Sequence, residues 1–274
     1  MLKRIAMAAI AATTFSVLPA VSMQAHADVQ PHRPGATRIL VTGDSMTHGK
    51  VGGYSWRYFL DKRITPGTVD FVGNLRGPST FVTPGSTYDD PRNYTDPDFD
   101  YEHHAIAGDV VCQDRWLKGK MSITELSRRY RPNIIVGAYG INDMGLGKKT
   151  PAQAIQCYGR WIDQARAVNP NVDFVLARLP WIWGNPNGGA KFNALLGWLA
   201  RVKTSSQSRI VLAQMPSSSN YNRVDDAYDH IHPNTSGEQK IAGMIASALK
   251  VQGVQVQADP LLPGNTFRPN LRPY

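Results

Sequence analysis

The feature that most constrains the fold is a regular alternation of short apolar runs with longer segments that carry apolar residues on one face. The short runs are rich in branched side chains and are bounded by turn residues, as is typical of buried strands. Strands are predicted over residues 38–42, 69–73, 133–140, 172–179 and 209–215, and helices over 55–64, 114–129, 150–168, 190–204 and 234–250. This alternation predicts the α/β class, as a three-layer α/β/α sandwich with a central parallel sheet. The pattern alone leaves the order of the strands open.

The N-terminal segment has the layout of a secretory signal. Lys3 and Arg4 form a positive start, residues 5–21 are largely apolar, and residues 25–27 read Ala-His-Ala, an Ala-x-Ala cleavage site. Polar residues and a proline interrupt the apolar run, which favours a cleaved signal over a membrane anchor. We therefore expect a signal peptide at residues 1–27 and a secreted, extracellular protein. Residues 28–274 are predicted to form a single domain with a proline-containing tail from about residue 252.

Charge and hydropathy indicate whether the protein binds nucleic acid or a membrane. The formal net charge is +9, but the basic residues are scattered along the chain. Scattered charges favour a solvated surface over a nucleic-acid site, although a weak attraction to acidic polysaccharide or anionic lipid stays open. No later segment approaches the ~20 continuous apolar residues of a membrane-spanning helix, so no integral membrane association is expected. We expect a monomer.

The chain has two cysteines, Cys112 and Cys157. Export would permit a disulfide, and a single pair is the simplest arrangement, although the sequence does not show that the two residues are close enough. No cluster of cysteine and histidine has the spacing of zinc ligands. No metal site is therefore predicted from these residue types.

A serine stands at the end of the first predicted strand, in the run Gly43-Asp44-Ser45. Open α/β sheets bind their ligands at the carboxyl ends of their strands. Near the start of the next helix, the hydroxyl of Ser45 could act as a nucleophile, and its N–H could face an anion. Most serines after strands are turn or cap residues, so the interpretation depends on what the rest of the chain offers.

The chain offers a histidine and an amide for the same chemistry. Asp229 precedes His232 by three residues, so its carboxylate can reach Nδ1 and turn Nε2 towards a serine. His230 is the near competitor, but its offset of one residue from Asp229 suits this contact less well. Asn142 follows the predicted strand 133–140, and its side-chain amide can donate to an oxyanion without carrying charge.

The runs around these residues resemble the sequence blocks of the GDSL, or SGNH, hydrolases. Residues 43–49 (Gly-Asp-Ser-Met-Thr-His-Gly) are similar to the first block, Gly140-x-Asn142-Asp143 to the third, and Asp229-x-x-His232-Pro-Asn to the last. The second block is matched by Ala-Gly-Asp at residues 107–109 only through its position. These blocks occur in the family's order over nearly the whole chain that follows the signal.

The resemblance implies a serine ester hydrolase that works through an acyl-enzyme. It assigns Ser45 as the nucleophile, His232 as the base and Asp229 as the residue that orients the base. The oxyanion donors would be the N–H groups of Ser45 and Gly108 and the side chain of Asn142. No metal or organic cofactor is expected.

The substrate is predicted less directly. The second strand and the compact single domain resemble secreted acetylxylan-esterase-like members, which implies removal of short acyl groups from carbohydrate; the partner would be a small ester or an acylated polysaccharide. Two sets of side chains bear on this choice. One set is aromatic and would either stack on sugars or pack the loops: Tyr88, Tyr94, Trp181 and Trp183. The other set is apolar and would line a groove for a longer acyl chain in a lipase or phospholipase: Leu146, Ile182, Leu261 and Leu262.

Two further alternatives stay open. The long segment 74–101 lacks periodicity and is rich in aspartate and tyrosine, so it is interpreted as the rim of a substrate cleft or, less simply, as a calcium site. A non-catalytic carbohydrate- or phosphate-binding protein is the alternative of another class, but it leaves Asn142 and His232 without a role.

Overall fold

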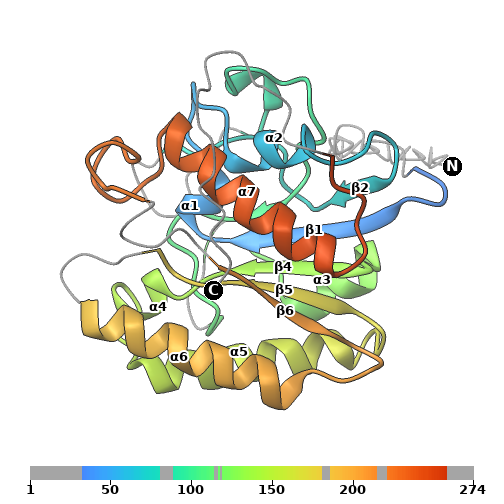
Figure 1. Cartoon of the computed structure of the whole chain (residues 1–274), viewed down its shortest axis with the longest axis vertical. Coiled ribbons are helices and arrows are strands. Elements are labelled where there is room, and N and C mark those ends of the chain that lie inside the picture. The colour runs from blue at the N-terminus through green and yellow to red at the C-terminus, as the bar shows by residue number, and fades with distance from the viewer. Residues whose placement is uncertain are drawn as a thin grey trace, which may run out of the picture. The chain divides into compact units, whose positions relative to one another are not determined.

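The computed structural model describes residues 33–80, 89–113, 117, 119–180, 186–214 and 221–257. Within these residues, six parallel strands form one sheet (Figure 1). The strands are β1 (Thr37–Gly43), β2 (Val69–Val72), β3 (His104–Ala105), β4 (Ile134–Ala138), β5 (Asp173–Ala177) and β6 (Ile210–Ala213). Their order is β2-β1-β4-β5-β6, and the short β3 pairs with the carboxyl end of β1. The predicted α/β fold with a central parallel sheet is confirmed.

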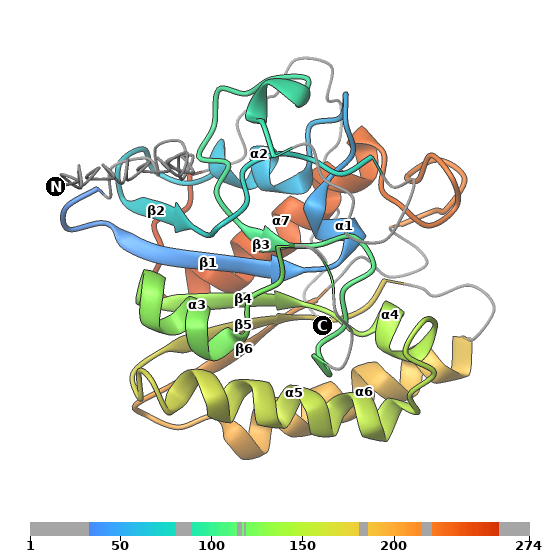
Figure 2. The same ribbon diagram turned by 180° about the vertical axis from the view of Figure 1, so that it is seen from behind.

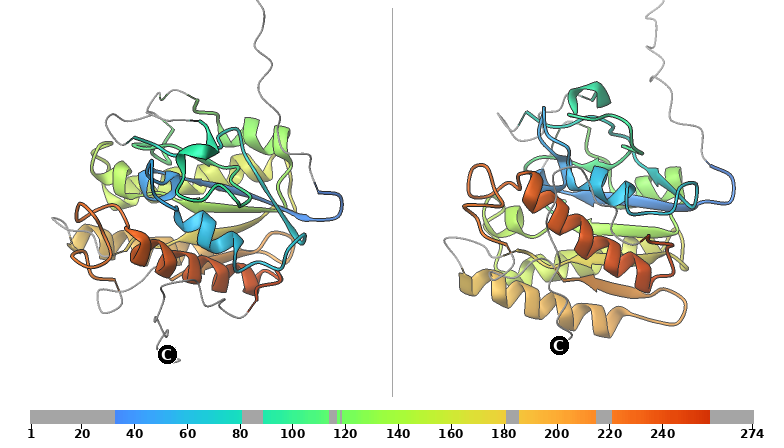
Figure 3. Two further views of the ribbon diagram at one scale, coloured as in Figure 1. Left: turned by 90° about the horizontal axis from the view of Figure 1, so that it is seen from above. Right: turned by 45° about the horizontal axis from the view of Figure 1, so that its top comes forward.

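Helices cover both faces of the sheet. They are α1 (Ser45–His48), α2 (Trp56–Asp61), α3 (Ile123–Tyr130), α4 (Ile141–Met144), α5 (Pro151–Arg166), α6 (Pro186–Lys203) and α7 (Thr235–Val251), with a 3-10 turn, η1, at Pro91–Asn93. On one face α2 packs along α7, and on the other α5 packs along α6 with α3 beside it (Figures 1 and 2). Figure 3 shows the pairing of α2 with α7 from two further directions.

The central strands are buried on both sides, so they appear in the sequence as continuous apolar runs rather than as an alternating pattern. Along β1, Leu40 belongs to the core beneath α3, α5 and α6, whereas Ile39 and Val41 belong to the core beneath α2 and α7. The neighbouring strand β4 divides in the same way, with Ile135 on the first side and Val136 on the second. All of these side chains are fully enclosed.

Two predicted helices have wrong starting points. The helix predicted over 114–129 begins only at Ile123, because Ser122 and Glu125 form a reciprocal capping box there. The helix predicted over 190–204 begins earlier, at Pro186. The two-residue strand β3 was not predicted at all, because its pairing with β1 depends on a distant partner rather than on a local pattern.

Cys112 and Cys157 form a disulfide, so the predicted pairing is confirmed. The bridge joins the loop after β3 to α5, across a sequence separation of 45 residues. Among the described residues, no helix combines the length and the apolar character needed to cross a membrane.

In the described parts of the segment 74–101, two carboxylates accept backbone N–H groups of the segment and of the neighbouring strand β2. Asp89 accepts the N–H groups of Arg76 and Gly77, and Asp100 accepts that of Phe71. Tyr94 is buried, so this ring packs the loop. Within the described residues, no group of three acidic, histidine or cysteine side chains is arranged to hold a metal ion.

Several predicted features lie outside the described residues. They are the signal segment, the tail beyond residue 257, Tyr88, Trp181, Ile182, Trp183, Leu261 and Leu262. Leu146, the remaining member of the proposed acyl-chain groove, is half exposed.

Candidate active site

Three adjacent strands bring the candidate residues to one edge of the sheet. Strand β1 lies between β3 and β4, and all three run in parallel, so their carboxyl ends share that edge. Ser45 follows β1, Gly108 follows β3, and Asn142 lies in α4 directly after β4. Parallel sheets bind ligands at this edge because loops of several strands meet there.

The turn that carries Ser45 is built by its neighbours. Asp44 caps α1: its carboxylate accepts the N–H of Met46 at 3.0 Å, and its carbonyl accepts the N–H of Thr47 at 3.0 Å. A Cβ at position 43 would lie 2.5 Å from Thr47 Oγ1, so only glycine allows the strand to turn this tightly. Asp44 and Met46 are enclosed, and Ser45 between them is partly exposed.

The structure brings Ser45, His232 and Asp229 into one chain of contacts. Nε2 of His232 lies 2.9 Å from Ser45 Oγ, although 187 positions separate the two residues. Nδ1 of the same ring lies 2.6 Å from Asp229 Oδ2. The other oxygen of Asp229 accepts the backbone N–H groups of His232 at 2.7 Å and Ile231 at 3.0 Å. The carboxylate thus holds both the loop and the ring that it carries.

The surroundings of Asp229 favour its charged form. Partial burial raises the pKa of this carboxyl, but the hydrogen bonds from the backbone and the ring of His232 outweigh it, so the pKa lies below its ordinary value. Tyr228 stacks on the His232 ring with an interplanar angle of 16°. His230, the competitor from the sequence, has φ 66°, in the left-handed region. The contact to the Ser45 hydroxyl is made by His232.

Gly108 lies in a loop whose other amide groups are all engaged. Among residues 106–113, every backbone N–H donates a hydrogen bond within the described structure except that of Gly108. The acceptors are Gly43 O for Ile106, His48 Nδ1 for Ala107, Ile106 O for Asp109, Asp109 Oδ1 for Val110, the Asp143 carboxylate for Val111 and Cys112, and Val110 O for Gln113. Gly108 has φ 83°, which a side chain would strain.

The two other predicted donors are also without a partner among the described residues. Nδ2 of Asn142 is buried and makes no hydrogen bond there. The backbone N–H of Ser45, at the start of α1, makes none either. A buried donor without an acceptor, such as Asn142 Nδ2, is costly. Together with the two backbone N–H groups at the same edge, it could bind a negatively charged oxygen of a ligand.

Asp143, next to Asn142, links α4 to the loop of Gly108. Its two oxygens accept the N–H groups of Val111 and Cys112, each at 3.1 Å. Burial raises the pKa of Asp143 to about 6, against the lowering effect of these two hydrogen bonds. The loop is therefore fixed twice at the same point, by the Asp143 carboxylate and by the disulfide of Cys112.

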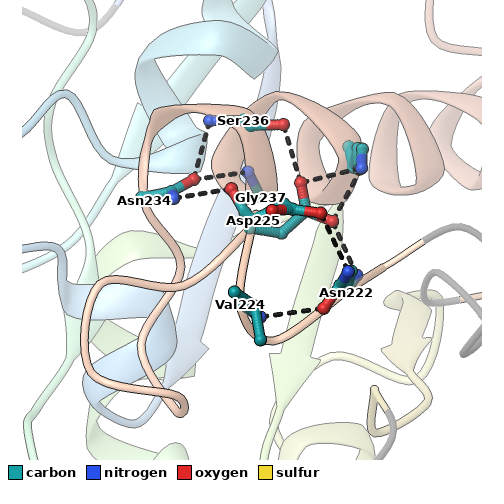
Figure 4. A network of polar contacts seen from close by, with 8 residues as sticks. Asn222, Val224, Asp225, Asn234, Ser236 and Gly237 are labelled. Atoms are coloured by element: carbon teal, nitrogen blue, oxygen red, sulfur yellow. Dashed lines mark hydrogen bonds and ion pairs between the residues drawn. The ribbon is translucent and has the colours of Figure 1, made fainter.

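Sequence reasoning missed the residues that hold the loop of His232. Asp226 is enclosed, and its carboxylate accepts from Asn222 N, Ser236 Oγ and Lys240 Nζ, each at 2.7 Å. Figure 4 shows the labelled side chains of Asn222 and Ser236 in this network of polar contacts. Asn234 caps α7 and donates from its side chain to Asp225 O at 2.8 Å. No motif or spacing marks Asp226 or Lys240, so only the folded arrangement identifies them.

The sequence profile of the GDSL-like lipase/acylhydrolase family matches residues 41–240. The fold and this match define a carboxylic ester hydrolase. The chain belongs to the GDSL-like lipase/acylhydrolase family. A comparison with curated proteins gave no match.

Solved structures with the same fold include three esterases. An acetyl esterase variant with bound acetate ion is 21% identical, with a TM-score of 0.63, and the match covers 79% of this chain and 97% of that chain. A carbohydrate esterase of family 3 from Talaromyces cellulolyticus is 22% identical, with a TM-score of 0.63 and the same coverage. A family 3 carbohydrate esterase from Clostridium thermocellum is 23% identical, with a TM-score of 0.59, covering 79% and 96%. At these identities the likeness supports the fold alone.

Proposed function

We propose that this hydrolase cleaves esters with Ser45 as the nucleophile, His232 as the base and Asp229 as the residue that orients the base. The observation that carries the proposal is the continuous contact from Asp229 Oδ2 through the His232 ring to Ser45 Oγ, at 2.6 Å and 2.9 Å. A serine hydroxyl is a weak nucleophile until a base accepts its proton, and a base in turn needs a fixed ring orientation.

The reaction proceeds in two halves. Ser45 Oγ attacks the ester carbonyl while its proton passes to Nε2 of His232. The tetrahedral intermediate collapses to an acyl-enzyme, and His232 returns the proton to the leaving alcohol. A water molecule then gives a proton to Nε2 and attacks the acyl carbonyl. The bond from this carbonyl to Ser45 Oγ breaks, Nε2 returns the proton to Oγ, and the carboxylic acid is released. Asp229 stays charged throughout and stabilises the protonated ring.

The negative charge on the carbonyl oxygen is assigned to three donors, the N–H groups of Ser45 and Gly108 and the side-chain amide of Asn142. Their lack of partners among the described residues supports this role. Removing one donor of this kind typically costs ~3 kcal/mol of transition-state stabilisation. The sequence supports Gly108 as an oxyanion donor only by its position. Stronger support is that every other backbone N–H of residues 106–113 already donates a hydrogen bond.

The proposed substrate is a carbohydrate that carries short acyl groups, in particular acetyl. An acetyl esterase and two family 3 carbohydrate esterases are among the solved structures that share this fold, and this supports the choice. Residues 1–27 are proposed to direct export, and residues 28–274 to form the exported enzyme. The disulfide between Cys112 and Cys157 supports an oxidising destination.

The test is hydrolysis of p-nitrophenyl esters from acetyl to palmitoyl by the wild type and by Ser45→Ala. We expect the wild type to prefer acetyl and the variant to lose turnover by at least about a thousandfold. Acetylated xylan would be tested next. A preference for long chains would replace the carbohydrate substrate with a lipid ester, and equal rates for the two proteins would refute the assignment of Ser45.

A further inference from the structure

His48 lies one helical turn after Ser45 and is fully enclosed. Its Nδ1 accepts the backbone N–H of Ala107 at 3.1 Å, across 59 positions of sequence. Ala107 immediately precedes Gly108, the residue whose N–H has no partner among the described residues. One side chain thus connects the turn that carries Ser45 to the loop that carries a proposed oxyanion donor.

The imidazole of His48 is an acceptor because it is neutral. Burial lowers its pKa to about 3, and the nearby charge of Arg57 acts in the same direction. A neutral imidazole carries one proton, and an Nδ1 that accepts from Ala107 must leave that proton on Nε2. The contact therefore defines both the charge and the tautomer of the ring.

The contact begins where the sheet ends. The N–H of Ile106 donates to Gly43 O at 3.0 Å, in continuation of the pairing between β3 and β1. Beyond Gly43 the backbone of β1 turns into α1. The next N–H of the loop, that of Ala107, is held by the side chain of His48 instead of by a strand.

The backbone beneath the imidazole is held by Arg57, which is also buried. Its guanidinium donates to the carbonyl of His48 at 3.0 Å and to that of Thr47 at 3.0 Å. Hydrogen bonds from a charged donor are among the strong ones in proteins. The ring of His48 therefore projects from a fixed turn, and the peptide that it holds is fixed relative to Ser45.

We propose that His48 is a positioning residue for ester hydrolysis: through Nδ1 it holds the Ala107–Gly108 segment so that the Gly108 N–H stays in place relative to Ser45 Oγ. This rests on the proposed function of Ser45 and Gly108. His48 does not touch the reacting atoms. Its effect belongs to the transition state rather than to substrate binding, because the negative charge on the carbonyl oxygen develops only as the tetrahedral intermediate forms.

Two polar substitutions separate this role from simple packing. In His48→Asn the side-chain oxygen can occupy the place of Nδ1, whereas in His48→Gln the oxygen lies one bond further out, near the place of Nε2. We expect His48→Gln to lower kcat about 10- to 100-fold with KM changed less than about 3-fold, and His48→Asn to retain most of the activity. The assay uses p-nitrophenyl acetate, with thermal unfolding to show that each variant is folded.

His103 provides a matched control. It is equally buried, its ring lies 5.2 Å from that of His48, and its Nδ1 accepts the N–H of Ala105, before the loop begins. We expect His103→Gln to lose stability to a similar degree but to keep kcat within about 3-fold of the wild type. Equal losses of kcat in His103→Gln and His48→Gln would overturn the proposal, as would equal losses in His48→Asn and His48→Gln.

A measurement on the wild type avoids any question of folding. Nitrogen-15 NMR of the imidazoles reports which ring nitrogen carries the proton. We expect His48 to hold its proton on Nε2 across the neutral pH range, and a proton on Nδ1 would overturn the proposal. Ser45→Ala in the same kinetic assay separates the two failures: if it is inactive while His48→Gln turns over normally, only the role of His48 is refuted.

Discussion

Asp229 is the residue on which the orientation of His232 depends. Its carboxylate accepts both from the ring and from the backbone of the loop, and its side chain is 43% exposed. Because Asp229 is exposed, water can also stabilise the protonated His232 ring. The Asp229 carboxylate is therefore expected to contribute less to kcat than a fully enclosed carboxylate would.

At this scale the first prediction concerns Asp229→Asn. The amide can offer an N–H to Nδ1, which favours the wrong tautomer of His232. Enclosed carboxylates of this kind cost about 10⁴ in kcat when changed to asparagine, so we expect about 10- to 100-fold for this exposed one. Steady-state kinetics on p-nitrophenyl acetate measure it. Asp225→Asn, four residues earlier and also exposed, is the control, and a kcat for Asp229→Asn equal to that of this control would contradict the role.

The loop from β6 to α7 is the element that delivers His232. A bridge between Ala227 and Pro233 closes it, and the Tyr228 N–H donates to His232 O at 3.1 Å. Below this closure, Asp226 ties the loop to Lys240 on α7. The loop is thus a closed unit on the start of a long helix, which explains how an exposed segment can hold a ring steadily.

At the scale of elements we predict different outcomes for two aspartate–lysine pairs. Asp226 is enclosed, so Asp226→Asn removes the buried charge that pairs with Lys240 and should lower the free energy of unfolding by about 3 kcal/mol. Asp163 pairs with Lys203 between α5 and α6 in an exposed position, so Asp163→Asn should cost less than about 1 kcal/mol. Urea denaturation compares them.

The same pair tests the link between the loop and activity. Asp226→Asn should also reduce kcat, because the loop that carries His232 loses its anchor, whereas Asp163→Asn should leave kcat unchanged. Equal effects of the two variants on stability and on kcat would show that the Asp226 contacts do not hold the loop.

The core of the protein contains buried carboxyl groups and buried histidines. Burial raises the pKa of Asp44 to about 8 and that of Glu238 to about 8. Burial also lowers the pKa of His48 and His104 to about 3 each. All four groups are therefore neutral in the folded protein at weakly acidic pH, which avoids isolated charges in the core.

The signs of these shifts predict how stability depends on pH. The contribution of the two carboxyl groups is complete below their ordinary pKa values of 3.8 and 4.5 and is lost as the pH rises to about 8. The contribution of the two histidines is complete above 6.5 and is lost as the pH falls to about 3. The two effects oppose each other between 4.5 and 6.5. Above 6.5 only the loss of the carboxyl contribution continues, so stability should decline from 6.5 towards 8.

Urea denaturation at several pH values measures this profile. Asp44→Asn keeps a neutral group with a capping oxygen, so it should weaken the decline above pH 6.5. Asp90→Asn is the control, because Asp90 lies outside the core and the hydrogen bonds from Arg92 lower its pKa to about 2, away from this range. Stability that increases from pH 6.5 to 8 in the wild type would contradict the assignment.

Local patterns account for most of what could be predicted. The apolar runs of β1, β4 and β5 are continuous because both faces of the sheet are covered, and this property is visible residue by residue. The contact between Asp229 and His232 could also be predicted from the sequence, because a separation of three residues within one turn places the two side chains close together. The start of α3 was missed because the predicted helix was extended backwards past the capping box at Ser122, although Ser-x-x-Glu is a recognisable signal.

The α/β class, the turn at Ser45, the amide at Asn142 and the pair of Asp229 and His232 can be predicted from the amino-acid sequence, since each depends on backbone periodicity or on neighbours within a few residues. The order of the strands, the contact of His48 with Ala107 and the anchoring of Asp226 follow from the folded arrangement. So does the Gly108 N–H, which has no partner among the described residues. These features join segments tens of residues apart. Their partners are selected by the packing of helices on the sheet, and no local pattern records that packing.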